Sequence, residues 1–186
     1  MLLAGLSHAE LTRGTVLDVG AGIGSLTFEL LEQGVERATI VEASAAYADA
    51  VTAEATRAGR ASAVRVIRGD LLHVAAQVPS ADIVTLDRVV CCYPRYEELL
   101  TTALERAARG FALSYPRERW YMRAAFASGN LLLRTTSGFR AYVHPEAAIR
   151  RLIERAGFEL VNHAHTMAWS ADVFRRVGST RARLTT

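Results

Sequence analysis

The segment TVLDVGAGIG, at residues 15–24, joins a short β-rich apolar run to three closely spaced glycines. Residues 15–19 predict a buried strand, and the segment SLTFELLEQG at residues 25–34 predicts a helix that ends at Gly34. Glycines between a strand and a helix let a ligand approach the backbone beside the helix N-terminus. The segment therefore predicts a ligand-binding turn at the carboxyl end of a strand.

The rest of the chain repeats this alternation of strands and helices. Further strands are predicted at 38–41, 64–67, 82–86 and 111–114, and helices at 45–58, 72–77, 96–108 and 145–156. The last two apolar runs, 158–165 and 168–175, have only a tight connection and should form an antiparallel hairpin. The pattern predicts an α/β fold with a doubly wound, mostly parallel seven-stranded sheet that contains an antiparallel C-terminal hairpin strand.

The chain length and composition predict one globular domain. With 186 residues, we expect a single domain over 1–176, including a short N-terminal helix at 1–13 and an insertion at 116–144, and a flexible tail at 177–186. No apolar run is long enough to span a membrane, and the start of the chain lacks the basic region of a signal peptide. A cytoplasmic location is therefore expected.

The charged and sulfur-containing residues exclude several kinds of chemistry. All 22 basic residues are Arg, so no mechanism can use a Lys base or Schiff base. A net charge of +3 is too small to indicate nucleic-acid binding. Cys91 and Cys92 are adjacent and form no disulfide framework, and no Cys/His cluster has zinc-site spacing. We therefore interpret both cysteines as packing residues and expect no metal.

Three acids lie at the ends of successive predicted strands. Asp18 lies two residues before Gly20, where its carboxylate can meet a cationic ligand group and would repel a pyrophosphate. Glu42 can accept hydrogen bonds from both hydroxyls of a ribose. Asp70 can accept from an adenine amine while Leu71 packs on the ring. Together these positions suit an adenosine joined to an amino acid, although Asp18 and Asp70 could instead cap backbone amides and the glycines could be plain turn residues.

The pattern resembles class I S-adenosylmethionine-dependent methyltransferases. The resemblance rests on DVGAGIG at 18–24, Glu42, the RGD of 68–70, the LDR that ends the fourth strand, and the terminal hairpin. It implies a Rossmann-like fold, S-adenosylmethionine as cofactor, and Asp87 and Arg88 beside the methionine tail and methyl group. The cofactor-binding residues that it implies are Asp18, Gly20, Ala21, Gly22, Gly24, Glu42, Ala43, Gly69, Asp70, Leu71, Asp87 and Arg88.

Two further segments reach the same sheet edge, at 87–96 and 115–123. The second combines aromatic faces with Arg donors, which suits a planar or apolar substrate that carries an acidic group. The candidate substrate residues are Tyr93, Tyr115, Arg117, Trp120 and Tyr121. The alternative is an amphipathic helix whose Trp120 and Tyr121 fill the core and whose Arg side chains are solvated.

The chemistry that the resemblance implies is an in-line methyl transfer. A carboxylate acceptor needs no base, whereas a phenol or amine would need one. The candidate catalytic residues are Tyr93, His144 and Asp87, with His73 as a further candidate base. His163 and His165 alternate along a predicted strand and are interpreted as structural or exposed residues.

The C-terminal half shows a narrower resemblance. Tyr115-Pro116, residues 138–140, residues 142–146 and the hairpin ending at 173–176 are similar to magnesium-protoporphyrin IX O-methyltransferases. The chain departs from that family at Cys92-Tyr93-Pro94, where the family has His-Tyr-Pro.

The expected function is therefore O-methylation of an acidic or phenolic group on a small molecule, without nucleic-acid or membrane partners. The alternative is a non-catalytic S-adenosylmethionine-binding module that serves a partner subunit. Asp18 and the Gly-x-Gly-x-Gly spacing disfavour a nicotinamide dehydrogenase. The segment after the fourth predicted strand, LDRVVCCYP, lacks a motif like Asn-Pro-Pro-Tyr, which disfavours a nucleic-acid methyltransferase.

Overall fold

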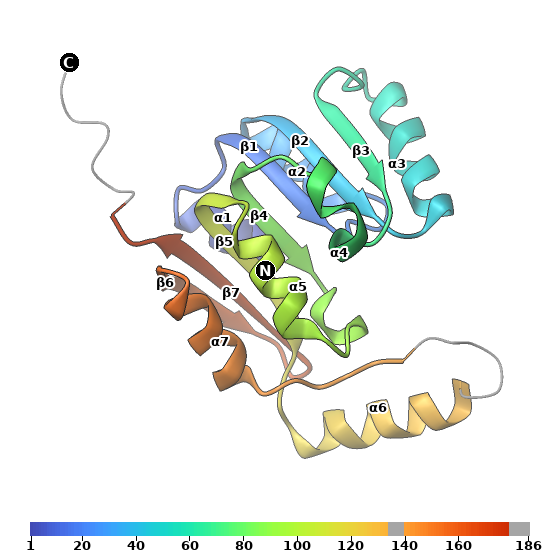
Figure 1. The fold of residues 1–186 in the computed structure, drawn as a ribbon, viewed down its shortest axis with the longest axis vertical. Coiled ribbons are helices and arrows are strands. Elements are labelled where there is room, and N and C mark those ends of the chain that lie inside the picture. The colour runs from blue at the N-terminus through green and yellow to red at the C-terminus, as the bar shows by residue number, and fades with distance from the viewer. Residues whose placement is uncertain (134–139, 179–186) are drawn as a thin grey trace.

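The computed structural model describes residues 1–133 and 140–178 and contains one seven-stranded sheet (Figure 1). The strand order is β3-β2-β1-β4-β5-β7-β6. The strands are β1 (Gly14–Val19), β2 (Val35–Glu42), β3 (Val64–Arg68), β4 (Ala81–Asp87), β5 (Ala107–Pro116), β6 (Phe158–His165) and β7 (Trp169–Arg176). Neighbouring strands from β3 to β5 pair in parallel, whereas β7 pairs antiparallel with both β5 and β6. The predicted fold class is confirmed.

Helices lie on both faces of the sheet (Figure 1). They are α1 (Leu2–His8), α2 (Ser25–Gln33), α3 (Ala45–Arg57), α4 (Leu71–Val74), α5 (Tyr96–Leu104), α6 (Trp120–Leu133) and α7 (Glu146–Arg155), with 3₁₀ turns η1 (Ala75–Gln77) and η2 (Val90–Cys92). Leucines of α1 and α2 pack in one buried cluster, and α4, α5 and α7 contribute to the other. Strand β1 is buried on both faces, which explains its nearly continuous apolar sequence.

Several element boundaries differ from the predictions, among them the N-terminal helix, which was predicted at 1–13 and ends at His8. Two further differences have a common cause. The helix predicted at 96–108 ends at Leu104, because Ala107 already pairs with Ala81 as the first residue of β5. Strand β2 begins at Val35 rather than at residue 38, because Val35 pairs with Gly14. In both places the pairing between strands that are distant in the sequence sets the boundary.

The predicted insertion and tail are described in part. Helix α6 occupies residues Trp120–Leu133 and extends away from the sheet (Figure 1). Residues 134–139 of the insertion and 179–186 of the tail lie outside the described residues. The division into a domain at 1–176 and a flexible tail stays a prediction. Within the described part of the chain, no helix is long and apolar enough to cross a membrane.

Candidate cofactor and acceptor site

The glycine loop lies between β1 and α2, at the carboxyl edge of the sheet. Gly20, Gly22 and Gly24 have φ values of +66°, +57° and +81°, a left-handed conformation that side chains disfavour. A Cβ at Gly20 would lie 2.6 Å from a methyl group of Val89, whereas a Cβ at Gly22 would meet nothing within 4 Å. Gly22 therefore borders open space, whereas Gly20 and Gly24 are packed against the side chains of Val89 and Phe28.

Glu42 ends β2 and is buried beside this loop. Its Oε2 accepts from the Gly22 amide at 2.9 Å, and its Oε1 accepts from the Ser44 amide at 2.7 Å. Ser44 in turn caps α3 through its hydroxyl, as the sequence predicts. The carboxylate predicted to hold a ribose therefore joins the glycine loop to the start of α3.

Asp18 is enclosed beneath the loop. Its carboxylate accepts from the hydroxyl of Thr27 in α2 at 2.6 Å and from that of Thr85 in β4 at 2.8 Å. The side chain is 1% exposed, so the expected contact with a cationic ligand group has to be corrected. Asp18 instead joins β1, α2 and β4. Burial raises the pKa of Asp18 to about 6. The hydrogen bonds from the Thr27 and Thr85 hydroxyls lower it, but their effect is smaller than that of burial.

Replacing Asp18 with Asn should change how stability depends on pH. The folded protein retains the Asp18 proton to about pH 6, whereas an unfolded chain releases it near 3.8. The folded state thus binds more protons in this window, and raising the pH should remove up to about 3 kcal/mol of unfolding free energy. Urea unfolding between pH 4 and 7 should show this fall in the parent and a smaller one in Asp18→Asn. If the unfolding free energies of the parent and of Asp18→Asn fall equally with pH, the raised pKa of Asp18 is contradicted.

Asp70 follows β3 and caps a helix. Its Oδ1 accepts from the Leu72 amide at 2.9 Å at the start of α4, which is the capping role left open by the sequence. Leu71 is 2% exposed and belongs to the core, so its expected position against an adenine ring has to be corrected. The Tyr93 phenol interacts with Asp70, and burial together with this carboxylate raises the pKa of Tyr93.

The end of β4 is tied to β5 and β7. The Ser114 hydroxyl donates to Asp87 Oδ1 at 2.5 Å and accepts from the Arg88 amide at 2.9 Å. Arg88 has a φ of +60°, which is uncommon for a residue with a side chain and recurs at functional sites. Its guanidinium lies 5.4 Å from the ring centroid of Trp169. Both Asp87 and Arg88 are exposed at the sheet edge.

His144 fastens the loop that follows β4. Its Nε2 lies 2.9 Å from the Tyr93 carbonyl oxygen and 3.1 Å from that of Val90. Only a protonated nitrogen can donate to these carbonyls, and burial lowers the pKa of His144, so the ring is neutral with its proton on Nε2. The ring also contacts Tyr96 and Tyr142. This geometry shows that His144 positions the loop after β4, and its role as a base stays a prediction.

The aromatic residues at the end of β5 and just after it have three different environments. Tyr115 is 1% exposed and its hydroxyl donates to Asp172, so it is a core residue and its expected substrate contact has to be corrected. Trp120 is 80% exposed, so the alternative that places it in the core is wrong. The Tyr121 hydroxyl donates to the Met167 carbonyl, and Arg117 Nη1 donates to the Thr166 carbonyl. Both contacts anchor this segment to the β6–β7 turn.

The cysteines also differ from each other. Cys91 is buried and its thiol donates to the Arg88 carbonyl at 3.2 Å, whereas Cys92 is exposed. The interpretation of both as packing residues is therefore wrong for Cys92. Their sulfurs are 3.8 Å apart, and the Cys91 thiol lowers the pKa of Cys92 to about 7. Within residues 1–133 and 140–178, no group of three His, Cys, Asp or Glu side chains could hold a metal ion.

Several residues of this edge carry no sequence signal of their own. Thr27 and Thr85 enclose Asp18, Ser114 joins Asp87 to Arg88, and Trp169 lies under the Arg88 guanidinium. Thr85, Ser114 and Trp169 come from strands distant in the sequence from the glycine loop, whereas Thr27 lies in α2, directly after that loop.

A family model described as a methyltransferase domain matches residues 2–163. The chain belongs to this methyltransferase family. The predicted recognition, the S-adenosylmethionine-dependent methyltransferase class and S-adenosylmethionine as its cofactor are confirmed. The residues present fit that group, because Gly22 borders open space beside the N-terminus of α2 and the Glu42 carboxylate.

Solved methyltransferases have a similar fold. Magnesium protoporphyrin IX methyltransferase from Synechocystis PCC 6803, with bound SAH, is 22% identical at a TM-score of 0.76 over 94% of this chain and 80% of that chain. An S-adenosylmethionine-dependent methyltransferase from Mesorhizobium loti is 13% identical at 0.69 over 87% and 90%. An O-methyltransferase family 2 protein from Planctomyces limnophilus, in complex with apigenin, is 18% identical at 0.67 over 88% and 51%. No curated protein sequence matched the chain.

Proposed function

We propose that this methyltransferase acts on an oxygen of a small molecule that carries an acidic group, with a phenolic oxygen as the second choice. The observation that carries the proposal is the buried Nε of Arg117, which has no hydrogen-bond partner among the described residues. Buried donors without a partner are rare in folded proteins. Arg106 Nε is a second such atom among the described residues, but it lies outside the predicted acceptor segment. An anionic acceptor group at the sheet edge would pair with the Arg117 guanidinium, with a small shift of this side chain that exposes its Nε.

The cofactor side of the proposal uses the residues of the carboxyl edge. The glycine loop, Gly20, Ala21, Gly22 and Gly24, would line the methionine part, and Glu42 with Ala43 would hold the ribose. Gly69 and Asp70 would face the adenine, and Asp87 and Arg88 would lie beside the methyl group. S-adenosylmethionine supplies an activated methyl group when bound, so the protein has to align the acceptor and exclude water.

Three of the four candidate bases, Tyr93, His144 and Asp87, have other partners, whereas His73 is exposed; this favours a carboxylate acceptor. His144 is neutral and directs its Nε2 proton to backbone carbonyls. The raised pKa of Tyr93 keeps its phenol protonated. Asp87 accepts from the Ser114 hydroxyl. A carboxylate acceptor is already ionised at neutral pH and needs none of these groups as a base.

The acceptor would lie between α6 and the sheet edge. Helix α6 is held at its start by the Tyr121–Met167 hydrogen bond and near its end by Asn130, whose side chain bonds both the carbonyl and the amide of Ala141. The Tyr142 amide then donates to the Cys91 carbonyl in the β4 loop. These hydrogen bonds connect the start of α6 to the β6–β7 turn and its end, through Ala141 and Tyr142, to the loop that follows β4.

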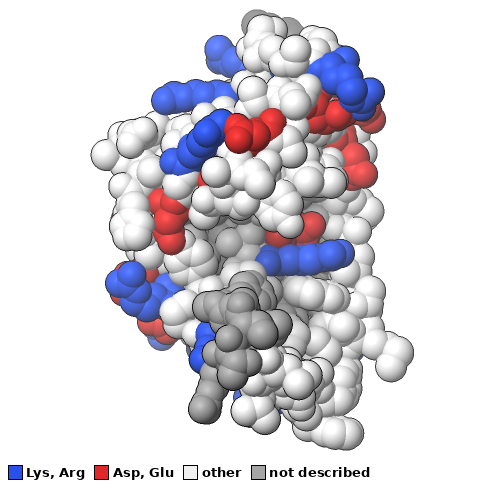
Figure 2. All heavy atoms as spheres, turned by 90° about the vertical axis from the view of Figure 1, so that its right-hand side faces the viewer, with Lys and Arg blue, Asp and Glu red and all other residues white. Residues whose placement is uncertain are grey.

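The alternative is a module that binds S-adenosylmethionine for a partner subunit. It is favoured by the large exposed apolar side chains of α6, which are 80%, 67% and 76% exposed at Trp120, Leu131 and Leu132. On the face seen in Figure 2, acidic and basic side chains are interspersed, and no patch of one sign indicates a nucleic-acid partner there. Methyl transfer by the purified chain alone would exclude the alternative.

Replacing Arg117 with Gln should weaken use of an acidic acceptor. The loss of a charged hydrogen-bond donor should raise the acceptor KM by about tenfold or more, without changing the affinity for S-adenosylhomocysteine. The measurement is transfer of a labelled methyl group to a panel of carboxylic and phenolic compounds. Arg119→Gln is the matched control, because Arg119 is exposed two residues away. Equal KM values for the two variants would overturn the acceptor assignment.

A further inference from the structure

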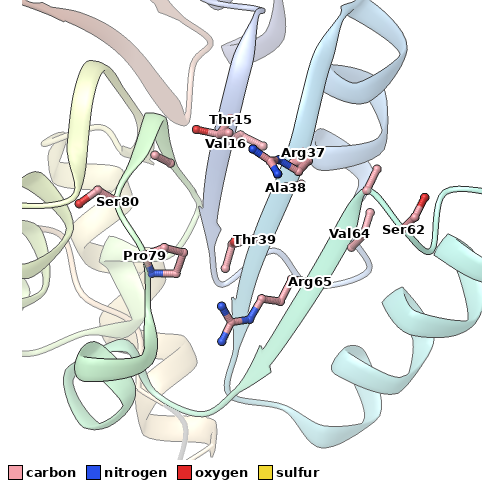
Figure 3. Close-up of a pocket in the computed structure, with 12 residues that line it drawn as sticks. Thr15, Val16, Arg37, Ala38, Thr39, Ser62, Val64, Arg65, Pro79 and Ser80 are labelled. Atoms are coloured by element: carbon pink, nitrogen blue, oxygen red, sulfur yellow. The ribbon is translucent and has the colours of Figure 1, made fainter.

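A groove of about 290 Å³ lies on the sheet at the amino-terminal halves of its strands (Figure 3). It is lined by residues of β1, β2 and β3 and by the segment at 79–81 that leads into β4. The glycine loop follows the carboxyl end of β1, so this groove is separate from the proposed methyl-transfer site. The methyltransferase family assignment therefore leaves the groove unexplained.

The groove exists because one helix is short. Side chains alternate between sheet faces, so Thr39 and Arg65 share a face with Val41 and Ile67, which lie in the core cluster under α4. Helix α4 has only four residues, Leu71–Val74, and follows the carboxyl end of β3. A longer helix would cover the amino-terminal part of this face, and the side chains beneath it would then be apolar. Because α4 is short, this part of the face carries polar side chains instead.

The groove is cationic. Arg37 and Arg65 both line it, and Figure 3 shows them over the strands with Thr39 between them in this view. Neither guanidinium has an ion-pair or hydrogen-bond partner in the part of the chain that the structure describes. Asp82 lies beside Thr15, but its Oδ2 accepts from the amide and hydroxyl of Thr15 and its Oδ1 is 3.9 Å from Arg109.

We propose that this groove binds a small phosphate-bearing molecule, either a phosphate monoester or a diphosphate. Arg side chains bind phosphate oxygens through paired N–H donors, and the hydroxyls of Thr39, Ser62 and Ser80 lie in the same groove. The volume lies near the lower end of the range for ligand pockets, about 300 Å³. It suits a compact ligand and leaves little room for a dinucleotide.

The test is a calorimetric titration with pyrophosphate at constant ionic strength. Saturating S-adenosylhomocysteine is present throughout, so that anion binding at the glycine loop does not contribute. We expect one site per chain, and we expect Arg37→Gln and Arg65→Gln each to weaken binding by about tenfold or more. Arg155→Gln is the matched control, since Arg155 is an exposed arginine at the end of α7, and its affinity should equal that of the parent.

Several results would overturn the proposal. They are no saturable binding to the parent, an equal loss in the Arg155 variant, or unchanged binding in both groove variants. Tighter binding of a single-stranded oligonucleotide through the same two arginines would assign the groove to nucleic acid instead. Circular dichroism checks that each variant folds, and Arg65→Lys, which keeps the charge but loses paired donors, should bind with intermediate affinity. Failure of the methyl-transfer tests would leave this result unaffected.

Discussion

Replacing Gly22 with Val should abolish the binding of S-adenosylhomocysteine while the domain stays folded. A side chain at this position would enter the open space beside the glycine loop, where a Cβ meets no protein atom within 4 Å. The φ of +57° adds about 1–2 kcal/mol of backbone strain, which lowers the melting temperature by only a few degrees. Calorimetry should therefore show at least a hundredfold loss of affinity, far beyond what that strain explains.

Gly59→Val is the matched control for this change. Gly59 has a φ of +64°, a Cβ there would also meet nothing within 4 Å, and the residue lies just after α3. The control should therefore lose similar stability and retain full affinity. Unchanged binding in Gly22→Val would contradict the placement of the cofactor, and unfolding of this variant alone would make the glycine a structural residue.

Replacing Asp172 with Ala should destabilise the protein by about 3–5 kcal/mol, the usual cost of breaking a buried ion pair. Asp172 is fully buried in β7. It accepts from the Tyr115 hydroxyl at 2.6 Å, from Arg150 Nε at 2.8 Å and Nη2 at 3.0 Å, and from His163 Nδ1 at 2.6 Å. Its removal leaves these donors in β5, α7 and β6 without their common acceptor.

Urea unfolding at neutral pH measures this loss, with Glu54→Ala as the control. Glu54 pairs with Arg57 on the surface of α3, and its removal should leave the free energy of unfolding nearly unchanged. If Asp172→Ala is as stable as the parent, the buried network does not hold the hairpin to the sheet. His163 thus has a structural position, as the sequence suggests, although its partner was not predictable.

Local sequence patterns predicted most of the fold because most strands contain an apolar run and several helices begin or end at a residue with its own signal. The glycines at 20–24 and Gly34 mark the ends of α2, and Ser44 begins α3. The mostly parallel sheet and the antiparallel hairpin followed from the alternation of elements and from the resemblance, whereas the strand order was not predicted. The boundary between α5 and β5 was wrong because strand pairing overrode the helical pattern.

The candidate site was harder to predict because one acid after a strand can serve two purposes. Asp70 follows a strand as a ligand-binding acid would, yet it caps α4. The enclosure of Asp18 depends on Thr27 and Thr85, which the sequence does not connect to it. The burial of Tyr115 could have been foreseen, because it shares the β5 face with Phe111 and Leu113 under the period-two alternation of a strand.

The position of Glu42 has a consequence for the thermodynamics of cofactor association. Because its two oxygens hold the Gly22 and Ser44 amides, the loop has its turn conformation before any ligand arrives. A carboxylate has about four lone-pair directions, so the same two oxygens retain capacity to accept from ribose hydroxyls. Association then requires little ordering of the backbone, and the conformational entropy that a mobile loop would lose on binding has already been lost during folding.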